Sequence, residues 1–447
     1  MICLSTRGTA PPVSFSQAVL EGLAPDGGLY VPSGLPRIAP ATWNAWRGVS
    51  FQEVAVNLAQ RLVGDEIEPT VLATLIADAL NFPIPVVTLA DDLRVVELFH
   101  GPTFAFKDVG ARVLARLMSH LQPPDASPLT VLVATSGDTG SAVAQAFFGV
   151  PRTRVVVLYP EGQVSAVQEA QFATLGGNVI TVAVQGTFDD CQRLAKLAFA
   201  DPDLAKRLRL TSANSISLGR LVPQLFYHAY ASLQAPEDAP AVISVPSGNF
   251  GNLAAGVMAW QLGAPIAGFV AATNVNDTVP RYMASGRVEP RPSVATLANA
   301  MDVGNPSNLE RLRWLFHDQV EPLRALVTPC IHTDEDIRTA IAELDDRYGY
   351  VADPHTAIGY LGALRAARTP APPHPRTLAP SHPRTVAPSH LVTRMFLATA
   401  HPAKFREVVE PVIGRPVPLP PALADALARP RIVNRITPTL AALADLL

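Results

Sequence analysis

The sequence has few cysteines, few charged residues and no long hydrophobic segment. Its 447 residues include three cysteines, and charged side chains make up 16% of the chain. Cys3, Cys191 and Cys330 are scattered and odd in number, which argues against a disulfide framework or a zinc-binding spacing and is typical of a reducing compartment. No apolar run reaches the length of a transmembrane helix, so the sequence predicts no association with a membrane.

An excess of positive charge is also absent, as is a hydrophobic leader. The formal net charge is −3, so the chain has no general attraction for nucleic acid, and any anionic substrate must be captured by a local site. Residues 1–14 lack the apolar core of a secretory signal. We therefore expect a cytoplasmic protein whose partner is a small molecule rather than a nucleic acid.

The chain is long enough for two or three domains, and its 48% hydrophobic content is enough for a substantial core. Residues 1–90 have a mainly helical pattern. Strands and helices then alternate, which is typical of parallel sheets, and a polar break at 234–241 divides this part. Apolar runs predict strands at 129–134, 154–159 and 178–184, and helical patterns predict one long helix late in 211–233 and another from residue 354. We predict one α/β domain at 91–235 and a second at 236–447.

A proline-rich segment interrupts the second predicted domain. Residues 368–391 form an imperfect eight-residue tandem repeat whose proline density excludes a helix or a central strand, so we predict a loop. His374, His382 and His390 lie in the repeat and suggest a metal site. Because no cysteine or carboxylate accompanies them, and a metal usually needs three or four convergent ligands, we expect no metal there.

Lys107 lies at a junction between a predicted strand and a predicted helix. The apolar residues Val95, Val96, Leu98 and Phe99 end a short strand, and residues 100–103 break it with Gly and Pro. A helical pattern then starts at Lys107. Asp108 suits the first turn of that helix. Taken alone, Lys107 is typical of a solvated helix end, because isolated lysines are mostly exposed.

Two further loops change that interpretation. The segments 131–142 and 242–256 each contain a Val/Ile-rich strand, a small polar loop and the start of a helix. The free N–H groups at a helix N-terminus bind anions, and small residues let the backbone approach a phosphate closely. Two such loops together with Lys107 match one chemistry, a lysine that forms an aldimine with pyridoxal phosphate.

Several long motifs resemble the threonine synthases of bacteria and fungi, over nearly the whole chain from Val13 onward. They are ELFHGPTFAFKD, ATSGDTGSAVA, VPSGNFGNLAAG, AATNVNDTVPR, NAMDVGNPSN and ATAHPAKF. That family belongs to the fold type II pyridoxal-phosphate enzymes, relatives of the tryptophan synthase β chain. The resemblance implies an α/β fold of parallel sheets with flanking helices and a mainly helical N-terminal region.

The resemblance also implies roles in cofactor binding. Lys107 would form the aldimine and then move protons as base and acid, and Thr399 would hydrogen-bond the pyridine nitrogen. Asp138 stands where many relatives have an asparagine near the cofactor's 3′ oxygen. The cradle for the cofactor phosphate would be formed by Gly248, Asn249, Phe250, Gly251 and Asn252.

The same resemblance places Ser136, Gly137 and Thr139 in the loop that binds the substrate carboxylate. The substrate phosphate needs cationic or N–H donors, and the sequence does not choose among its candidates. These candidates are Lys404, Arg112, Asn214, Ser215 and Arg220. Lys404 and Arg220 could equally form ordinary surface ion pairs.

The implied activity is that of a pyridoxal-phosphate lyase that converts O-phospho-L-homoserine and water to L-threonine and phosphate, acting as a monomer or homodimer. One alternative is a related amino-acid lyase or dehydratase, against which the HGPTFAFKD and AHPAKF motifs argue. Another is a catalytically silent protein that binds phosphorylated metabolites. The intact Lys107 and the intact 248–252 loop argue against it.

Overall fold

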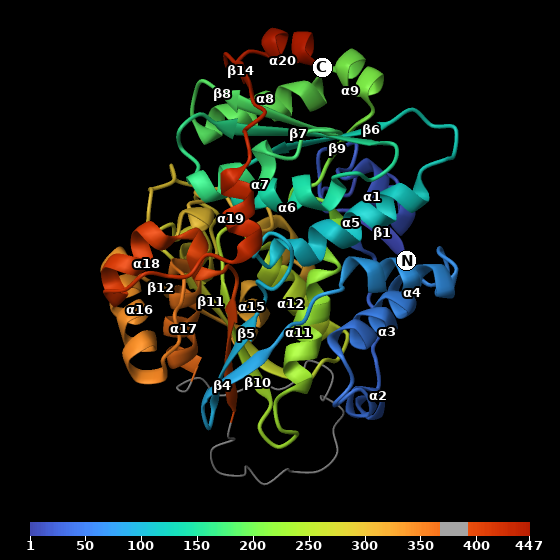
Figure 1. Cartoon of the computed structure of the whole chain (residues 1–447). Coiled ribbons are helices and arrows are strands. Elements are labelled where there is room, and N and C mark those ends of the chain that lie inside the picture. The colour runs from blue at the N-terminus through green and yellow to red at the C-terminus, as the bar shows by residue number, and fades with distance from the viewer. Residues whose placement is uncertain (367–391) are drawn as a thin grey trace.

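The computed structural model describes residues 1–366 and 392–447 (Figure 1). The predicted proline-rich loop at 368–391, with its three histidines, therefore lies outside the described residues. Within the described ranges, no helix has both the length and the apolar character needed to cross a membrane. The architecture contains two larger sheets that are mainly parallel, helices around them, and a small N-terminal sheet.

The first large sheet has five parallel strands in the order β14-β8-β7-β6-β9. Its strands are β6 (Leu129–Ala134), β7 (Thr153–Pro160), β8 (Val179–Val184), β9 (Leu210–Ser212) and β14 (Asn434–Ile436). The first three match the predicted apolar runs within one residue at each end. Strands β6 and β7 are buried along almost their whole length, which explains their continuous apolar sequence.

The second large sheet has six strands in the order β12-β11-β10-β13-β5-β4, and all neighbours are parallel except β4 and β5. Its strands are β4 (Val86–Ala90), β5 (Leu93–Glu97), β10 (Ala241–Pro246), β11 (Ile266–Thr273), β12 (Val327–Ile331) and β13 (Thr393–Ala398). The carboxyl ends of β5, β10 and β13 lead into the loops that carry the predicted site residues.

The chain crosses between the two sheets, which differs from the predicted division at residue 235. β5 lies within the predicted 91–235 unit, yet Val95 of β5 pairs with Phe396 of β13 in the second sheet. Near the C-terminus, β14 belongs to the predicted 236–447 unit but pairs with β8 of the first sheet. Neighbouring parallel strands can be far apart in sequence, so the order of elements alone did not reveal these pairings.

The N-terminal region contains helices, as predicted, and also a small antiparallel sheet that the sequence analysis missed. The sheet consists of β1 (Ile2–Ser5), β2 (Val13–Ser14) and β3 (Tyr30–Pro32). The helices are α1 (Phe15–Glu21), α2 (Pro40–Ala45), α3 (Phe51–Val63) and α4 (Pro69–Ala79). Strands of two to four residues are too short to produce a clear alternation of apolar and polar residues.

The remaining helices surround the two large sheets. Those before residue 262 are α5 (Lys107–Leu121), α6 (Asp138–Phe147), α7 (Ala166–Ala173), α8 (Phe188–Ala200), α9 (Pro202–Leu208), α10 (Leu218–Leu221), α11 (Gln224–Leu233) and α12 (Gly251–Gln261). The later ones are α13 (Thr278–Ser285), α14 (Leu309–Leu315), α15 (Val320–Leu326), α16 (Asp334–Tyr348), α17 (Pro354–Ala366), α18 (Arg406–Ile413), α19 (Pro421–Ala428) and α20 (Leu440–Leu446). The sequence predicted one long helix late in 211–233. The structure divides it into α10 and α11 at Pro223, which has no N–H for a helical hydrogen bond.

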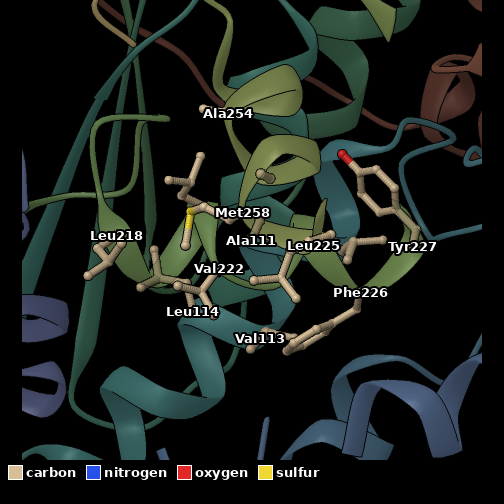
Figure 2. Close-up of a cluster of buried hydrophobic side chains, with 14 of the residues drawn as sticks. Ala111, Val113, Leu114, Leu218, Val222, Leu225, Phe226, Tyr227, Ala254 and Met258 are labelled. Carbon is tan, nitrogen blue, oxygen red and sulfur yellow. The ribbon is translucent and has the colours of Figure 1, made fainter. Parts of the chain in front are cut away.

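One buried cluster ties α5 to α12, two of the helices that begin at predicted cofactor-binding residues. Figure 2 shows side chains of α5, α10, α11 and α12 in contact, among them Leu114, Leu225 and Met258. Burying such side chains stabilises the fold by roughly 1.5–3 kcal/mol each. This shared core therefore fixes the helix that carries Lys107 relative to the helix that follows the glycine-rich loop.

Candidate active site

Lys107 is the first residue of α5 and lines a cavity of about 1470 Å³. The loop before it is anchored to the end of β13, because the Phe106 N–H donates to the Thr399 carbonyl at 2.9 Å. Asp108 anchors the loop from the other side, since its buried carboxylate accepts from the N–H and the hydroxyl of Thr103 at 2.8 and 2.6 Å. The structure thus holds Lys107 at a fixed position in the cavity wall.

Burial makes the Lys107 amine unusually easy to deprotonate. Removal from water disfavours the ammonium form and lowers the pKa of Lys107 to about 8, although the carboxylate of Asp138 acts in the opposite direction. At pH 7 about a tenth of Lys107 is then neutral, whereas a lysine with the ordinary pKa of 10.5 would be almost fully charged. Lys107 can therefore act as a nucleophile and as a proton carrier near neutral pH.

Asp138 and Lys404 form a buried ion pair next to Lys107. The Lys404 Nζ lies 2.6 Å from Asp138 Oδ1 and donates to the Thr103 carbonyl at 2.9 Å. Gln168 Nε2 donates to the same Asp138 oxygen at 2.8 Å. Burial raises the pKa of Asp138, but the charges of Lys404 and Lys107 outweigh it and hold this pKa well below the usual range. Lys404, predicted as a candidate ligand of the substrate phosphate, thus has its ammonium paired with Asp138.

The predicted phosphate cradle is the loop between β10 and α12, where Phe250 adopts a left-handed conformation immediately before the helix. Asn249 fastens the loop on two sides: its Nδ2 donates to the Ser215 hydroxyl at 2.7 Å, and its Oδ1 accepts from the Ser307 N–H at 2.6 Å. At Gly248 a Cβ would lie 2.6 Å from the Met301 Cα, so this position requires glycine. Ser247, Gly248, Asn249, Phe250, Gly251 and Asn252 all line the cavity.

Several buried polar atoms at the cavity wall have no partner within the described structure. They belong to Asn214 (Oδ1), Arg220 (Nε) and Asn252 (Nδ2), and each of these residues lines the cavity. Buried polar groups are nearly always hydrogen-bonded, so these atoms indicate a polar ligand. Together with the amine of Lys107 and the N-terminus of α12, this set of two donors and one acceptor fits a ligand that carries both an aldehyde and a phosphate.

The structure brings most of the other predicted site residues to the cavity. Ser136, Thr139, Ser215 and Thr399 line the same cavity as Lys107. Gly137 caps α6 with a positive φ of 143°, where a Cβ would clash with Gln168. Arg112 lies elsewhere, because its guanidinium donates to the carbonyls of Asp78 and Ala79 at 3.0 and 2.6 Å.

The sequence analysis missed a histidine in the cavity wall. His355 Nδ1 lies 2.6 Å from Asp353 Oδ2, and His355 Nε2 accepts from the Ala300 N–H at 3.2 Å. This pattern places the imidazole proton on Nδ1 and fixes the turn that contacts Gly248. The Asp-Pro-His sequence at the start of α17 was the available signal, but it was interpreted only as the start of a helix.

A comparison with known protein families identifies the class of enzyme to which the chain belongs. Residues 90–376 match the family model described as "Pyridoxal-phosphate dependent enzyme", and this range contains Lys107, both predicted anion-binding loops and most of the cavity wall. The protein is therefore a pyridoxal-phosphate-dependent enzyme of the fold type II class.

The flanking regions narrow the class to one family. Residues 3–80 match "Threonine synthase N terminus", and residues 381–447 match "Threonine synthase, C-terminal". The chain is 42% identical to the threonine synthase of Escherichia coli over 437 residues, which cover 97% of this chain and 96% of that protein. It is 44% identical to the enzyme of Serratia marcescens, over 92% of this chain and 91% of that one. The chain belongs to the threonine synthase family.

Solved structures agree with this assignment. The crystal structure of threonine synthase from Escherichia coli matches with a TM-score of 0.88 and 40% identity, over 100% of this chain and 99% of that one. The pyridoxal-phosphate-bound threonine synthase from Brucella melitensis matches with a TM-score of 0.90 and 34% identity, over 100% of this chain and 98% of that one. A tomato threonine deaminase at 16% identity and a TM-score of 0.52 shares the fold alone.

Proposed function

We propose that the cavity around Lys107 converts O-phospho-L-homoserine and water to L-threonine and phosphate. The proposal rests on one observation. A readily deprotonated lysine and a glycine-rich loop at a helix N-terminus line the same cavity. The family supplies the substrate, and the geometry supports the roles that we propose for the residues. Three buried cysteines, none of them in a disulfide, support a cytoplasmic location.

Lys107, Asp138 and Thr399 would hold the cofactor, and the 248–252 loop would hold its phosphate. When bound, the cofactor supplies an electron sink for negative charge that develops on the substrate carbon. The neutral amine of Lys107 then accepts the substrate's α proton and returns it later, a role that its lowered pKa favours. The walls of the cavity would orient the substrate.

The loop containing Ser136, Gly137 and Thr139 would bind the substrate carboxylate through the N-terminal end of α6. Asn214, Ser215 and Arg220 would receive the substrate phosphate, because all three line the cavity and Arg220 is a buried cation. We leave Lys404 out of this set, because its ammonium pairs with Asp138.

One assay separates the proposed activity from its alternatives. Incubation of the cofactor-loaded protein with O-phospho-L-homoserine is expected to release phosphate and L-threonine in equal amounts. A related dehydratase would release ammonia and a 2-oxo acid, and a silent metabolite-binding protein would release nothing. Either of these two results would refute the proposal.

Asn249→Asp is expected to weaken binding of pyridoxal phosphate by about 100-fold while changing stability little. The new carboxylate would lie in the partly buried loop that we propose to hold the cofactor phosphate, and two like charges about 4 Å apart repel by roughly 4 kcal/mol before relaxation. Titration of the cofactor-free protein measures the change. The matched control is Asn57→Asp on α3, which is expected to leave the affinity unaltered. An unchanged affinity in Asn249→Asp would place the phosphate elsewhere.

A further inference from the structure

Arg311, in α14, is a fully buried arginine that the proposed chemistry does not use. Its side chain has no exposed surface, and it is among the largest completely buried side chains of the described structure. Arginine is seldom buried so deeply without a charged partner, because an unpaired buried charge is costly. The reason for its burial must therefore lie in what surrounds it.

The guanidinium of Arg311 is surrounded by neutral oxygen atoms. Its Nε and Nη2 donate to the Tyr30 carbonyl at 3.1 and 3.0 Å, and Nη1 donates to the Ser215 carbonyl at 2.9 Å. Nη1 also donates to Asn308 Oδ1 at 2.7 Å, and Nη2 donates to the Ile216 carbonyl. These bonds satisfy the donors but leave the positive charge without a counter-charge.

No ion pair involves Arg311 in residues 1–366 and 392–447. The nearest acidic neighbour in sequence is Glu310, whose carboxylate is partly exposed, lies 3.9 Å from Arg7 and accepts a hydrogen bond from Thr6. Burial lowers the pKa of Arg311 to about 9, with Glu310 opposing the shift, so the guanidinium stays charged at neutral pH. The structure thus contains an uncompensated cation.

Two of the residues that Arg311 holds, Ser215 and Asn308, contact the glycine-rich loop. The Ser215 hydroxyl accepts from Asn249 Nδ2 at 2.7 Å and from Asn308 Nδ2 at 3.4 Å. A Cβ at Gly251 would lie 3.2 Å from the Asn308 side chain and 3.4 Å from the Ser215 Cβ. Arg311 therefore lies directly behind the partners of the loop, at the side away from the cavity.

We propose that Arg311 is a positioning residue that serves as the buried counter-charge for the phosphate group bound at the 248–252 loop. It aligns Ser215 and Asn308 against the loop, and its charge is compensated when a dianion occupies the loop. A phosphate in front of the loop lowers the energy of the lone cation, and the cation lowers the energy of the phosphate. The inference rests on the proposed function, because that function places a phosphate at this loop.

The test compares Arg311→Lys with Arg311→Gln in the full-length, cofactor-free protein, with inorganic phosphate as the probe. Both variants lose the planar five-donor fork, but only Lys keeps the charge. Phosphate is expected to raise the melting temperature of the wild type and of Arg311→Lys, because a ligand of the native state stabilises it. In Arg311→Gln the phosphate dissociation constant is expected to rise at least tenfold, against about threefold in Arg311→Lys.

A purely structural role gives a different result, because the Lys and Gln variants would then lose phosphate affinity to the same extent. That outcome refutes the counter-charge and leaves the proposed function intact. Asn249→Asp serves as the reference: if it does not reduce phosphate binding, the loop is not the phosphate site and the proposed function of the loop fails as well.

Arg311→Met provides a second neutral variant. If neither neutral variant folds without phosphate while Arg311→Lys does, the charge is required in the absence of an anion, and the proposal is wrong.

Discussion

Lys107→Ala is expected to lower threonine formation by at least 1000-fold in a protein that stays folded. The amine would hold the cofactor and carry the α proton, and proton transfer by a positioned side chain alone contributes roughly 100- to 10,000-fold. Loss of the side chain should not destabilise the fold. The lowered pKa shows that the ammonium is buried at a cost, and we expect this cost to outweigh its weak attraction to the Phe106 ring, whose centroid lies 5.9 Å away.

Covalent retention of the cofactor provides a measurement independent of turnover. After borohydride reduction the wild type is expected to keep the cofactor through denaturation, and Lys107→Ala to lose it. Lys107→Arg is the matched control, since it keeps a positive charge but has no amine that can become neutral near pH 7. It should be as inactive as the alanine variant. Activity within tenfold of the wild type in either variant would contradict the assignment of Lys107.

The pKa of Lys107 also predicts a pH dependence. The rate at which the cofactor-free protein attaches pyridoxal phosphate is expected to rise with pH up to about 8 and then level off, because only the neutral amine attacks the aldehyde. The free energy of unfolding is also expected to rise with pH. The unfolded state, in which the pKa of Lys107 is 10.5, binds the proton more tightly than the folded state, in which it is about 8. The wild type therefore gains stability relative to Lys107→Ala as pH rises from about 8 to 10.5. A flat attachment rate between pH 6 and 9 would contradict this account.

The sequence predicted the features that depend on local chemistry. Strand β6 was predicted with its observed bounds, and α5 begins at Lys107 as expected. These elements depend on apolar periodicity and on the residues that end strands, both of which are visible in a short window. The strand-loop-helix segment at 242–256 and the strand-helix junction at Lys107 were each identified in this way, and the structure brings them to one cavity.

The features that the sequence did not reveal depend on contacts between distant segments. Lys404 and Asp138 are 266 positions apart, and nothing local indicates that Lys404 is buried beside that carboxylate rather than exposed to a substrate. The pairing of β5 with β13 has the same origin. For His355, the local sequence gave a helix start but not the contact with Ala300 that places it at the cavity.

The buried pair of Lys404 and Asp138 leads to the second large expected effect. Lys404→Met is expected to lower the free energy of unfolding by about 3–5 kcal/mol, because it leaves the Asp138 carboxylate in a buried site without its nearest cation. The Thr103 carbonyl also loses the hydrogen bond from Lys404 Nζ. Denaturant unfolding of the cofactor-free protein measures the loss, and the surface substitution Lys206→Met is the matched control, expected within about 0.5 kcal/mol of the wild type.

The double variant Asp138→Asn with Lys404→Met distinguishes an unpaired charge from lost packing. Removing both charges leaves a neutral amide that can still accept from Gln168 Nε2, so most of the lost stability should return. The two substitutions should therefore be strongly non-additive, with a coupling of about 2 kcal/mol or more. If the double variant were as unstable as the sum of the single variants, the loss in Lys404→Met would come from packing. In that case the charge of Lys404 would not be what keeps the Asp138 carboxylate ionised beside Lys107.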